Sequence, residues 1–189
     1  MASNQQPINL TTSEYIENSY KQLSAAHPDV NKFALPKIDK VVLNVGVGRY
    51  DEKQKSDIAN LMQKLTSHVP RKIAARVSIA SFKLRAGQTV GLSLTLRGQK
   101  AIDFIMQLVY VALPRTRDFK GIKGTAFDNN FNCYSMGLEN VSIFPAIGFD
   151  TNVQFGMQVN VVFKQPTPLN KEFLQILNFP FKKTELEIK

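Results

Sequence analysis

The residues with the greatest catalytic potential are few and far apart in this sequence. His27 and His68 are the only histidines, and neither has a cysteine or carboxylate nearby at the spacing of a metal-ligand set or of a nucleophile with its base. Asp118 and Asp128 occur in a Gly- and Asn-rich segment, where aspartate usually forms turns. Cys133 is the only cysteine, which excludes an internal disulfide or CxxC motif. We therefore expect no enzyme activity, no metal and no cofactor.

A glycine pair offers the nearest match to a small-molecule motif. The run NVGVGRY places Gly46 and Gly48 between an expected strand and an expected helix, as at the start of a dinucleotide fingerprint. The third glycine of that fingerprint is missing, and no acidic residue follows about 20 positions later. A tight strand-to-helix turn accounts for the pair more simply. A nucleotide-dependent enzyme that uses the Gly46–Gly48 turn is the alternative function.

The chemistry that the composition favours is contact with phosphate. Lys and Arg outnumber Asp and Glu by 24 to 15, which gives a formal net charge of +9. This bias favours an anionic partner, with nucleic acid ahead of an acidic membrane surface. The longest apolar run, 101–113, is too short to span a bilayer, and the start MASNQQPINL does not resemble a signal peptide. We expect a cytoplasmic protein without membrane contact.

Basic and apolar residues alternate at one expected turn. Phe82, Lys83, Leu84 and Arg85 lie in SFKLRAG, between two segments whose alternating pattern predicts an antiparallel hairpin. A projecting tip of this composition suits contact with a polyanion, although many basic hairpin tips are only solvated turns.

The periodicity of apolar residues predicts the elements that position these groups. Helices are expected at 12–26, 52–68, 99–113 and 167–178. Strands are expected at 38–46, 72–80, directly after the hairpin tip, 138–144 and 152–164. This order predicts an α+β fold with a mostly antiparallel sheet, helices on one face and a split-βαβ-like connection. We expect a single domain over 1–189, flexible ends at 1–9 and 184–189, and a long functional loop at 115–137.

The hydrophilic sides of these strands should gather on one surface. If their apolar sides meet the helices, the opposite surface is cationic and hydrogen-bonding, without acidic or aromatic side chains. Its expected members are Asn44, Arg76, Ser78, Ser93, Thr95, Arg97, Gln154, Gln158, Asn160 and Lys164. Because readers of single-stranded RNA stack bases on exposed aromatics, we expect a folded or double-helical RNA, recognised through its backbone and 2′-hydroxyls.

Several motifs in the same order resemble one protein family. LPKIDKVVLNVGVG, SFKLRAGQTVGLSLTLRG, LPRTRDFKG, NCYSMGLENVSIFPAIGFD and LNFPFKK together resemble the bacterial form of ribosomal protein L-five, the 5S rRNA-binding protein of the large ribosomal subunit. The resemblance covers about residues 10–183.

The resemblance implies a non-enzymatic protein in the central protuberance of the ribosome. The implied 5S rRNA contacts are Asn44, Val45, Gly46, Arg76, Ser78, Thr95 and Arg97. The implied contacts of the 80–88 tip with P-site tRNA are Ser81, Phe82, Lys83, Arg85 and Gln88. The 115–137 loop would bridge to protein thirteen of the small-subunit head through Arg115, Arg117, Lys120, Asn129, Asn130 and Phe131. The other implied partners are 23S rRNA and neighbouring 5S-associated ribosomal proteins.

The chain departs from the family pattern near the tip and in the bridge segment. Ala74 and Val77 stand where the family usually carries more basic residues, and Glu139 replaces a typically basic residue. The turn at 127–137 is one residue longer than usual and lacks the family's glycines. The bridge is therefore the part of the resemblance with the fewest matching residues.

Overall fold

The computed structural model describes residues 12–82, 84–117, 119–147 and 153–182. The expected flexible ends at 1–9 and 184–189 lie outside these ranges, as do Lys83 and Asp118. Within them the α-helices are α1 (Thr12–Ala26), α2 (Glu52–Thr66), α3 (Gln99–Gln107) and α4 (Leu169–Ile176). The strands are β1 (Ile38–Gly46), β2 (Arg71–Ala74), β3 (Thr89–Arg97), β4 (Cys133–Leu138) and β5 (Met157–Phe163).

The strands form one antiparallel sheet in the order β2-β3-β1-β5-β4. The chain runs from β1 through α2 to β2, and β3 lies between these two strands in the sheet. It then runs from β3 through α3 and β4 to β5, and β1 lies between β3 and β5. β3 splits the β1-α2-β2 unit, so the expected α+β fold with a split-βαβ-like connection is confirmed.

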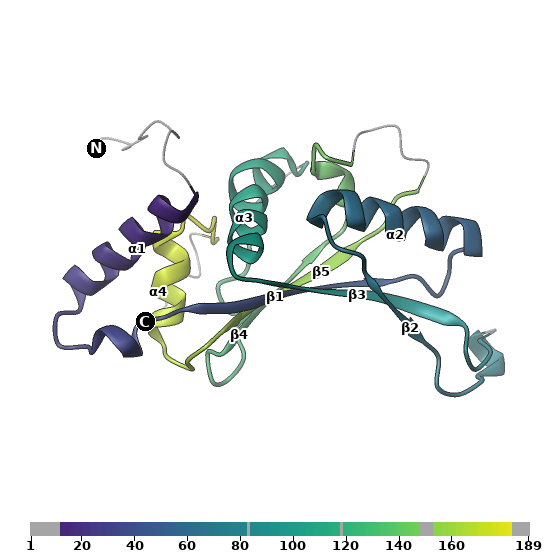
Figure 1. The fold of residues 1–189 in the computed structure, drawn as a ribbon, viewed down its shortest axis with the longest axis horizontal. Coiled ribbons are helices and arrows are strands. Elements are labelled where there is room, and N and C mark those ends of the chain that lie inside the picture. Colours follow the sequence, from purple (N-terminus) through teal and green to yellow (C-terminus); the bar gives the residue numbers. More distant parts are fainter. Residues whose placement is uncertain (1–11, 83, 118, 148–152, 183–189) are drawn as a thin grey trace.

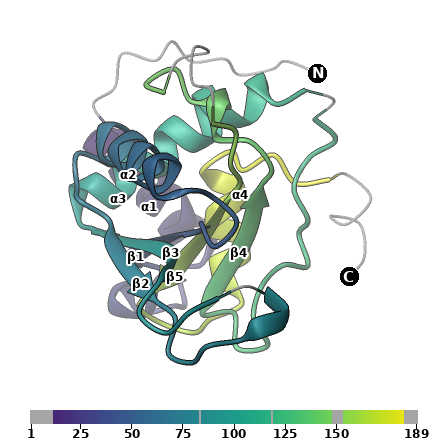
Figure 2. The same ribbon diagram turned by 90° about the vertical axis from the view of Figure 1, so that its right-hand side faces the viewer.

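The helices cover one face of this sheet (Figures 1 and 2). Alternation in β1 explains the arrangement: Val41, Leu43 and Val45 are buried toward the helices, whereas Asn44 is exposed on the other side. The apolar stripe of α2 meets them with Ile58, Leu61, Met62 and Leu65, all buried in one continuous hydrophobic cluster. Burial of these side chains from both layers fixes which face of the sheet remains open.

Local sequence determines where α2 and α3 begin and end. Asp51 is the N-cap of α2 and forms a capping box with Gln54, whose Oε1 accepts the Asp51 amide at 3.2 Å. The chain beyond α3 widens into a π-turn over Leu108–Ala112 and then enters a 3-10 turn that contains Pro114. Proline has no amide hydrogen to continue the helix, so the predicted stop at this position is confirmed.

A hydroxyl cluster ties the first and last helices to the π-turn that follows α3. Tyr110 donates its phenolic hydrogen to the Tyr15 oxygen at 2.5 Å, and the Asn178 side-chain amide donates to both oxygens, at 2.9 and 3.0 Å. Burial is the main reason that the pKa of Tyr15 is raised, and the contact with Tyr110 raises it further. The cluster therefore holds α1 against the π-turn that follows α3 and against the residues after α4.

The expectation for the second strand is wrong in length and in face. β2 ends at Ala74, and its pairing places Arg71 opposite Ser93 and Ile73 opposite Gly91 on the open face. Ile73, Val77 and Ile79, which the alternation assigned to the core, are 40%, 67% and 43% exposed. Ile73 is exposed because it faces the open side of the sheet, and Val77 and Ile79 are exposed because the hairpin continues past the end of β2, where no core lies behind it.

The expectation for the fourth strand is also wrong. β4 begins within the expected loop at Cys133, and residues Val141–Ile143 form a 3-10 turn instead. Tyr134, Met136 and Leu138 are buried, so the true alternation of this strand runs through a segment whose glycine and asparagines favoured a loop. The expected range 152–164 shortens to Met157–Phe163, which leaves Gln154 outside the sheet.

The two edges of the sheet differ. β2 is four residues long and loses register between Ile73 and Ala74. At the other edge, segment 126–128 lies along β4: the Ser135 amide donates to the Ala126 carbonyl at 3.1 Å, and the Asp128 amide donates to the Cys133 carbonyl at 2.9 Å. Neither edge presents a long, regular row of unpaired backbone groups.

Candidate nucleic-acid interface

The open face of the sheet consists of side chains that lie side by side across the strands. Directly paired residues share a face in an antiparallel sheet. Register therefore defines four cross-strand rows: Ile73–Gly91–Gly46, Arg71–Ser93–Asn44–Gln158–Gly137, Thr95–Val42–Asn160–Ser135, and Arg97–Lys40–Val162–Cys133. None of these residues is acidic or aromatic. The expected gathering of Asn44, Ser93, Thr95, Arg97, Gln158 and Asn160 is confirmed.

Positive charge is concentrated at one end of the open face. Arg97 and Lys40 pair across β3 and β1, and both expose part of their side chains. Asp39 is the nearest carboxylate, with an oxygen 3.8 Å from the Lys40 ammonium nitrogen. Arg71, which the sequence did not place here, adds a third cation on the β2 side. The end of the face formed by Lys40 and Arg97 is thus suited to phosphate groups.

Neutral hydrogen-bonding groups fill the middle of the face. Asn44 lies between Ser93 and Gln158 in one row, and the Gln158 amide donates to the Asn160 side-chain oxygen at 3.2 Å. Asn44 and Thr95 are exposed on the same surface. Amide and hydroxyl groups that donate and accept can meet sugar hydroxyls and phosphate oxygens.

Glycines line the other end of the face. A depression of 650 Å³ is bordered by Gly46, Gly91, Gly137 and Gly156, next to Asn44 and Gln158. A Cβ atom added at Gly46 or Gly137 would have no neighbour within 4 Å, so it would project into open space. The absence of side chains at these two positions leaves the sheet backbone open to close approach by a ligand.

Three of the expected 5S contacts lie elsewhere. The Val45 side chain is 1% exposed and faces the helices, so only its backbone can reach the open face. Arg76 and Ser78 follow the end of β2 and belong to the hairpin, where the Ser78 hydroxyl accepts the Ala86 amide at 2.9 Å. Ser78 thus has a structural role in the hairpin, and the side chains of these three residues do not lie on the open face.

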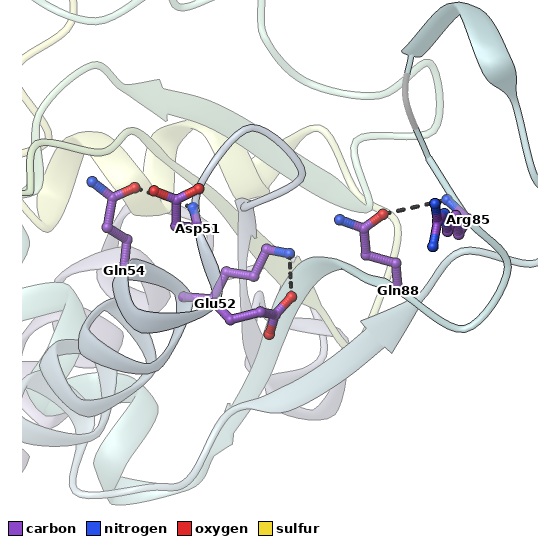
Figure 3. A network of polar contacts seen from close by, with 6 residues as sticks. Asp51, Glu52, Gln54, Arg85 and Gln88 are labelled. Carbon is purple, nitrogen blue, oxygen red and sulfur yellow. Dashed lines mark hydrogen bonds and ion pairs between the residues drawn. The ribbon is translucent and has the colours of Figure 1, made fainter.

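The hairpin that carries the tip, described over residues 75–82 and 84–88, projects below the sheet on its open side (Figure 2). The Ile79 and Leu84 amides and carbonyls pair at 3.0 and 3.1 Å and close the turn. Phe82 is 72% exposed at this turn, and Ser81 and Arg85 are exposed beside it. Gln88 is half-buried, and its side-chain oxygen accepts the Arg85 amide at 3.3 Å (Figure 3). The tip is therefore an ordered projection in which Gln88 supports the fold of the turn.

The expected bridge residues form two separate groups. Arg115, Arg117 and Lys120 line a depression of 620 Å³ together with Glu139, beyond the end of β4. Asn129, Asn130 and Phe131 form a turn before the start of β4, where the Phe131 carbonyl accepts the Asn170 amide at 2.7 Å. Because β4 separates the two groups by about 17 Å at the usual rise per residue, they cannot act as one compact site.

The residues considered for catalysis have structural partners. His27 Nε2 lies 2.7 Å from a Glu172 carboxylate oxygen on α4, and His68 Nδ1 lies 2.8 Å from the Ser67 carbonyl. In the described ranges no three His, Cys, Asp or Glu residues gather in a way that could hold a metal ion. No helix within the same ranges is long and apolar enough to cross a membrane.

The Gly46–Gly48 turn joins β1 to α2 through a compact set of backbone contacts. The Val47 amide donates to the Val90 carbonyl at 2.9 Å, and the Tyr50 amide donates to the Val47 carbonyl at 3.2 Å. The first turn of α2 is already capped by Asp51, whose carboxylate occupies the place where a bound phosphate would lie (Figure 3). This geometry favours the structural turn over a dinucleotide site.

Comparison with known proteins supplies the family. A family model described as Ribosomal protein L5 matches residues 31–85, and a second model, for the C-terminus of the same ribosomal family, matches residues 89–181. The chain belongs to the ribosomal protein L5 family. Only residues 86–88 of the hairpin lie between the two matches, so the L5 assignment covers every strand of the sheet.

Bacterial relatives agree with the L5 assignment. The large ribosomal subunit protein uL5 of Dehalococcoides mccartyi is 38% identical over 179 residues, which are 92% of this chain and 99% of that protein. The uL5 protein of Desulforapulum autotrophicum is 40% identical over 156 residues, which are 80% of this chain and 87% of that protein. The uL5 protein of Mycoplasma mycoides is 39% identical over 155 residues, which are 79% of this chain and 84% of that protein. The resemblance to a bacterial-type L5 is confirmed. Since these relatives are named as ribosomal proteins, the alternative of a nucleotide-dependent enzyme is set aside.

Proposed function

We propose that this L5 protein is a structural constituent of the large ribosomal subunit in the cytoplasm and binds 5S rRNA with the open face of its sheet. The family assignment supports a ribosomal RNA partner. The observation that carries the more specific proposal is the open face itself: three cations, a row of amides and hydroxyls, and an open glycine floor on one surface without a carboxylate in its rows.

Binding on this surface proceeds without covalent chemistry. Lys40, Arg71 and Arg97 displace counterions from RNA phosphates, which supplies most of the affinity. Asn44 and Thr95 donate to and accept from the sugar and backbone groups, and this fixes the register of the RNA on the sheet. The rows contain no aromatic side chain for base stacking, which favours recognition of a folded RNA by its shape.

The hairpin tip is proposed as the contact with P-site tRNA. It projects on the same side as the open face but stands clear of the sheet (Figure 2), and it exposes Ser81, Phe82 and Arg85. Gln88 holds the turn through the Arg85 amide and reaches the tRNA only indirectly. Lys83 belongs to the same proposed contact by its place in the sequence.

The contact with protein thirteen of the small-subunit head is proposed for the depression lined by Arg115, Arg117 and Lys120. Its exposed basic residues suit contact with acidic groups on the surface of a protein partner. The turn at Asn129–Phe131 lies at the opposite end of β4 and would serve a different contact. We retain 23S rRNA and the neighbouring 5S-associated proteins as partners of the assembled subunit.

A filter-binding titration tests the central proposal. The full chain is titrated with 5S rRNA, and with a tRNA of similar charge density as the competitor, from low to moderate salt. With about six phosphate contacts, the logarithm of the affinity should fall against the logarithm of the salt concentration with a slope of magnitude about 4 to 5. Equal affinity for the two RNAs would contradict specific binding of 5S rRNA.

Sedimentation of a cell lysate through sucrose tests the assembly. The protein should travel with large subunits and whole ribosomes. Recovery only at the top of the gradient would contradict its place in the subunit.

A further inference from the structure

A basic groove with an exposed aromatic ring lies at the end of the molecule opposite the hairpin tip. It has a volume of 700 Å³ and is formed by the end of α1, the 3-10 turn Lys32–Ala34 and the chain that follows β5. Figure 1 shows this turn and the start of β1 at the far end of the sheet from β2. The volume falls within the range of about 300–1,000 Å³ typical of ligand sites.

Phe33 is the most exposed large apolar side chain in the described part of the chain, at 88%. Its backbone is nevertheless held on both sides: the Asn31 side-chain oxygen accepts the Phe33 amide at 3.1 Å, and the Gln165 side chain donates to the Phe33 carbonyl at 2.8 Å. The exposed ring is therefore presented by an anchored turn. Because isolated apolar residues occur on most protein surfaces, the exposure alone does not identify a site.

Positively charged side chains surround Phe33 in the groove. Lys21, Lys37 and Lys164 line the same groove, and none of them forms an ion pair with any described residue. The groove has no acidic residue in its lining. Tyr20 completes one wall, where its ring stacks on Phe173 with centroids 4.9 Å apart. An aromatic plane surrounded by free ammonium groups is the arrangement that binds an unpaired nucleotide, with the base on the ring and phosphates on the cations.

The groove is continuous with the open face. The Lys164 amide donates to the Lys37 carbonyl at 2.8 Å, which extends the pairing of β1 and β5 by one step. Lys164 follows Gln158, Asn160 and Val162 in the alternation and so belongs to the open side. The nearest row of the open face is the one that contains Lys40 and Arg97. An RNA seated on that row can reach the groove without leaving the cationic surface.

We propose that Phe33 stacks on an unpaired base of the RNA bound to the open face, while Lys21, Lys37 and Lys164 hold the adjoining phosphates. This inference rests on the proposed function, because it assumes that the open face binds RNA. It adds a base-stacking contact to a surface whose rows lack aromatic side chains.

Single-tryptophan fluorescence tests this contact directly. The chain contains no tryptophan, so Phe33→Trp places the only indole in the groove. Titration with 5S rRNA should quench this fluorescence until it reaches a plateau. The RNA concentration at half-maximal quenching should equal the midpoint of binding that filter binding gives for the same variant. Val69→Trp is the matched control, since Val69 is 76% exposed on the connection between α2 and β2 and lies outside the groove. Its fluorescence should not change.

Affinity measurements complete the test. Phe33→Ala and Phe33→Leu should each weaken 5S rRNA binding at least about fivefold, the lower limit for loss of one base–aromatic stack, whereas Phe33→Tyr should bind like the unaltered chain. Thermal unfolding of each variant should match that of the unaltered chain, because the ring is exposed.

The possible failures can be told apart. If 5S rRNA binds but Phe33→Trp is not quenched and Phe33→Ala binds within twofold, the stacking contact is wrong, the groove is left for a protein partner, and the proposed function stands. If the unaltered chain does not bind 5S rRNA, both proposals fail.

Discussion

Lys40 and Arg97 lie directly opposite each other on β1 and β3, with both side chains on the open face. Like charges opposite each other in a sheet reduce its stability, and only Lys40 has a carboxylate nearby, at 3.8 Å. A phosphate group between the two side chains would remove this repulsion. The pair therefore links the folding of the sheet to its proposed ligand.

Replacement of Arg97 by glutamine should separate binding from folding. We expect weaker 5S rRNA binding and a salt slope smaller in magnitude by about 0.7 to 0.9, as for loss of one phosphate contact. The free energy of unfolding in urea should be unchanged or slightly higher, because the repulsion with Lys40 is gone. Lys53→Gln, an exposed change on α2, is the control and should leave the affinity unaltered. Equal affinities for the two variants would argue against the role of Arg97.

A side chain added at Gly46 should block the glycine-lined depression. Gly46 has no positive φ angle, and a Cβ there meets nothing within 4 Å, so Gly46→Val should fold normally. The valine methyl groups would occupy the space where RNA approaches the sheet, and we expect 5S rRNA affinity to fall about tenfold, or about 1.4 kcal/mol. Filter binding and a thermal melt measure the two effects. Normal affinity with a normal melt would show that RNA does not enter this depression.

The hairpin tip can be tested independently of the sheet. Lys83→Ala combined with Arg85→Ala should preserve 5S rRNA affinity and reduce tRNA occupancy of the P site on purified ribosomes, because Arg85 is exposed on the hairpin and outside the rows of the open face. Gln88→Ala, which removes the acceptor of the Arg85 amide, should have a smaller effect on tRNA through a looser turn. Unchanged tRNA occupancy in the double variant would contradict the proposed contact.

The hydroxyl cluster of Tyr15 predicts a pH dependence of stability. Its pKa in the folded chain lies above the ordinary value of 10, so the unfolded chain loses this proton first as the pH rises. The stabilisation is complete below pH 10 and declines above it, by less than about 1.4 kcal/mol per pH unit because the phenol is only partly buried. Urea unfolding of Tyr15→Phe at pH 9 and pH 11 should therefore show a smaller decline than the unaltered chain. The raised pKa of Tyr20 contributes equally to both proteins.

Elements with a core behind them were predictable from the sequence. The apolar alternation of β1 and the stripe of α2 correspond to buried side chains, and the helix expected from residue 52 begins there. In each case the local pattern and the tertiary environment agree. The family motifs, which consist of residues alone, also identified a bacterial-type L5.

The sequence failed where the local pattern and the environment differ. The apolar residues Ile73, Val77 and Ile79 occur at the alternating positions expected of a half-buried strand. Alternation shows which residues lie on the same side of a strand, but it does not show whether a helix covers that side. At β4, a glycine and three asparagines hid a strand whose partner, β5, lies far along the chain.

The groove at Phe33 was missed for a related reason. Its lysines come from α1, the start of β1 and the end of β5, and only the folded chain brings them to one ring. A single phenylalanine between Asn31 and Pro36 carries no periodic signal. Arg71 was missed because the face of the sheet on which it lies depends on how β2 pairs with β3. A shift of this register by one residue moves every side chain of the strand to the opposite face.

The structure of the two sheet edges affects self-association of the protein before it is assembled into a ribosome. β2 is short, irregular after Ile73 and carries Arg71 and Lys72, while β4 is already hydrogen-bonded along its outer side by segment 126–128. Short charged edges and covered edges both discourage strand addition by a second copy. The sheet of a newly made chain is thus protected against self-association at its two edges.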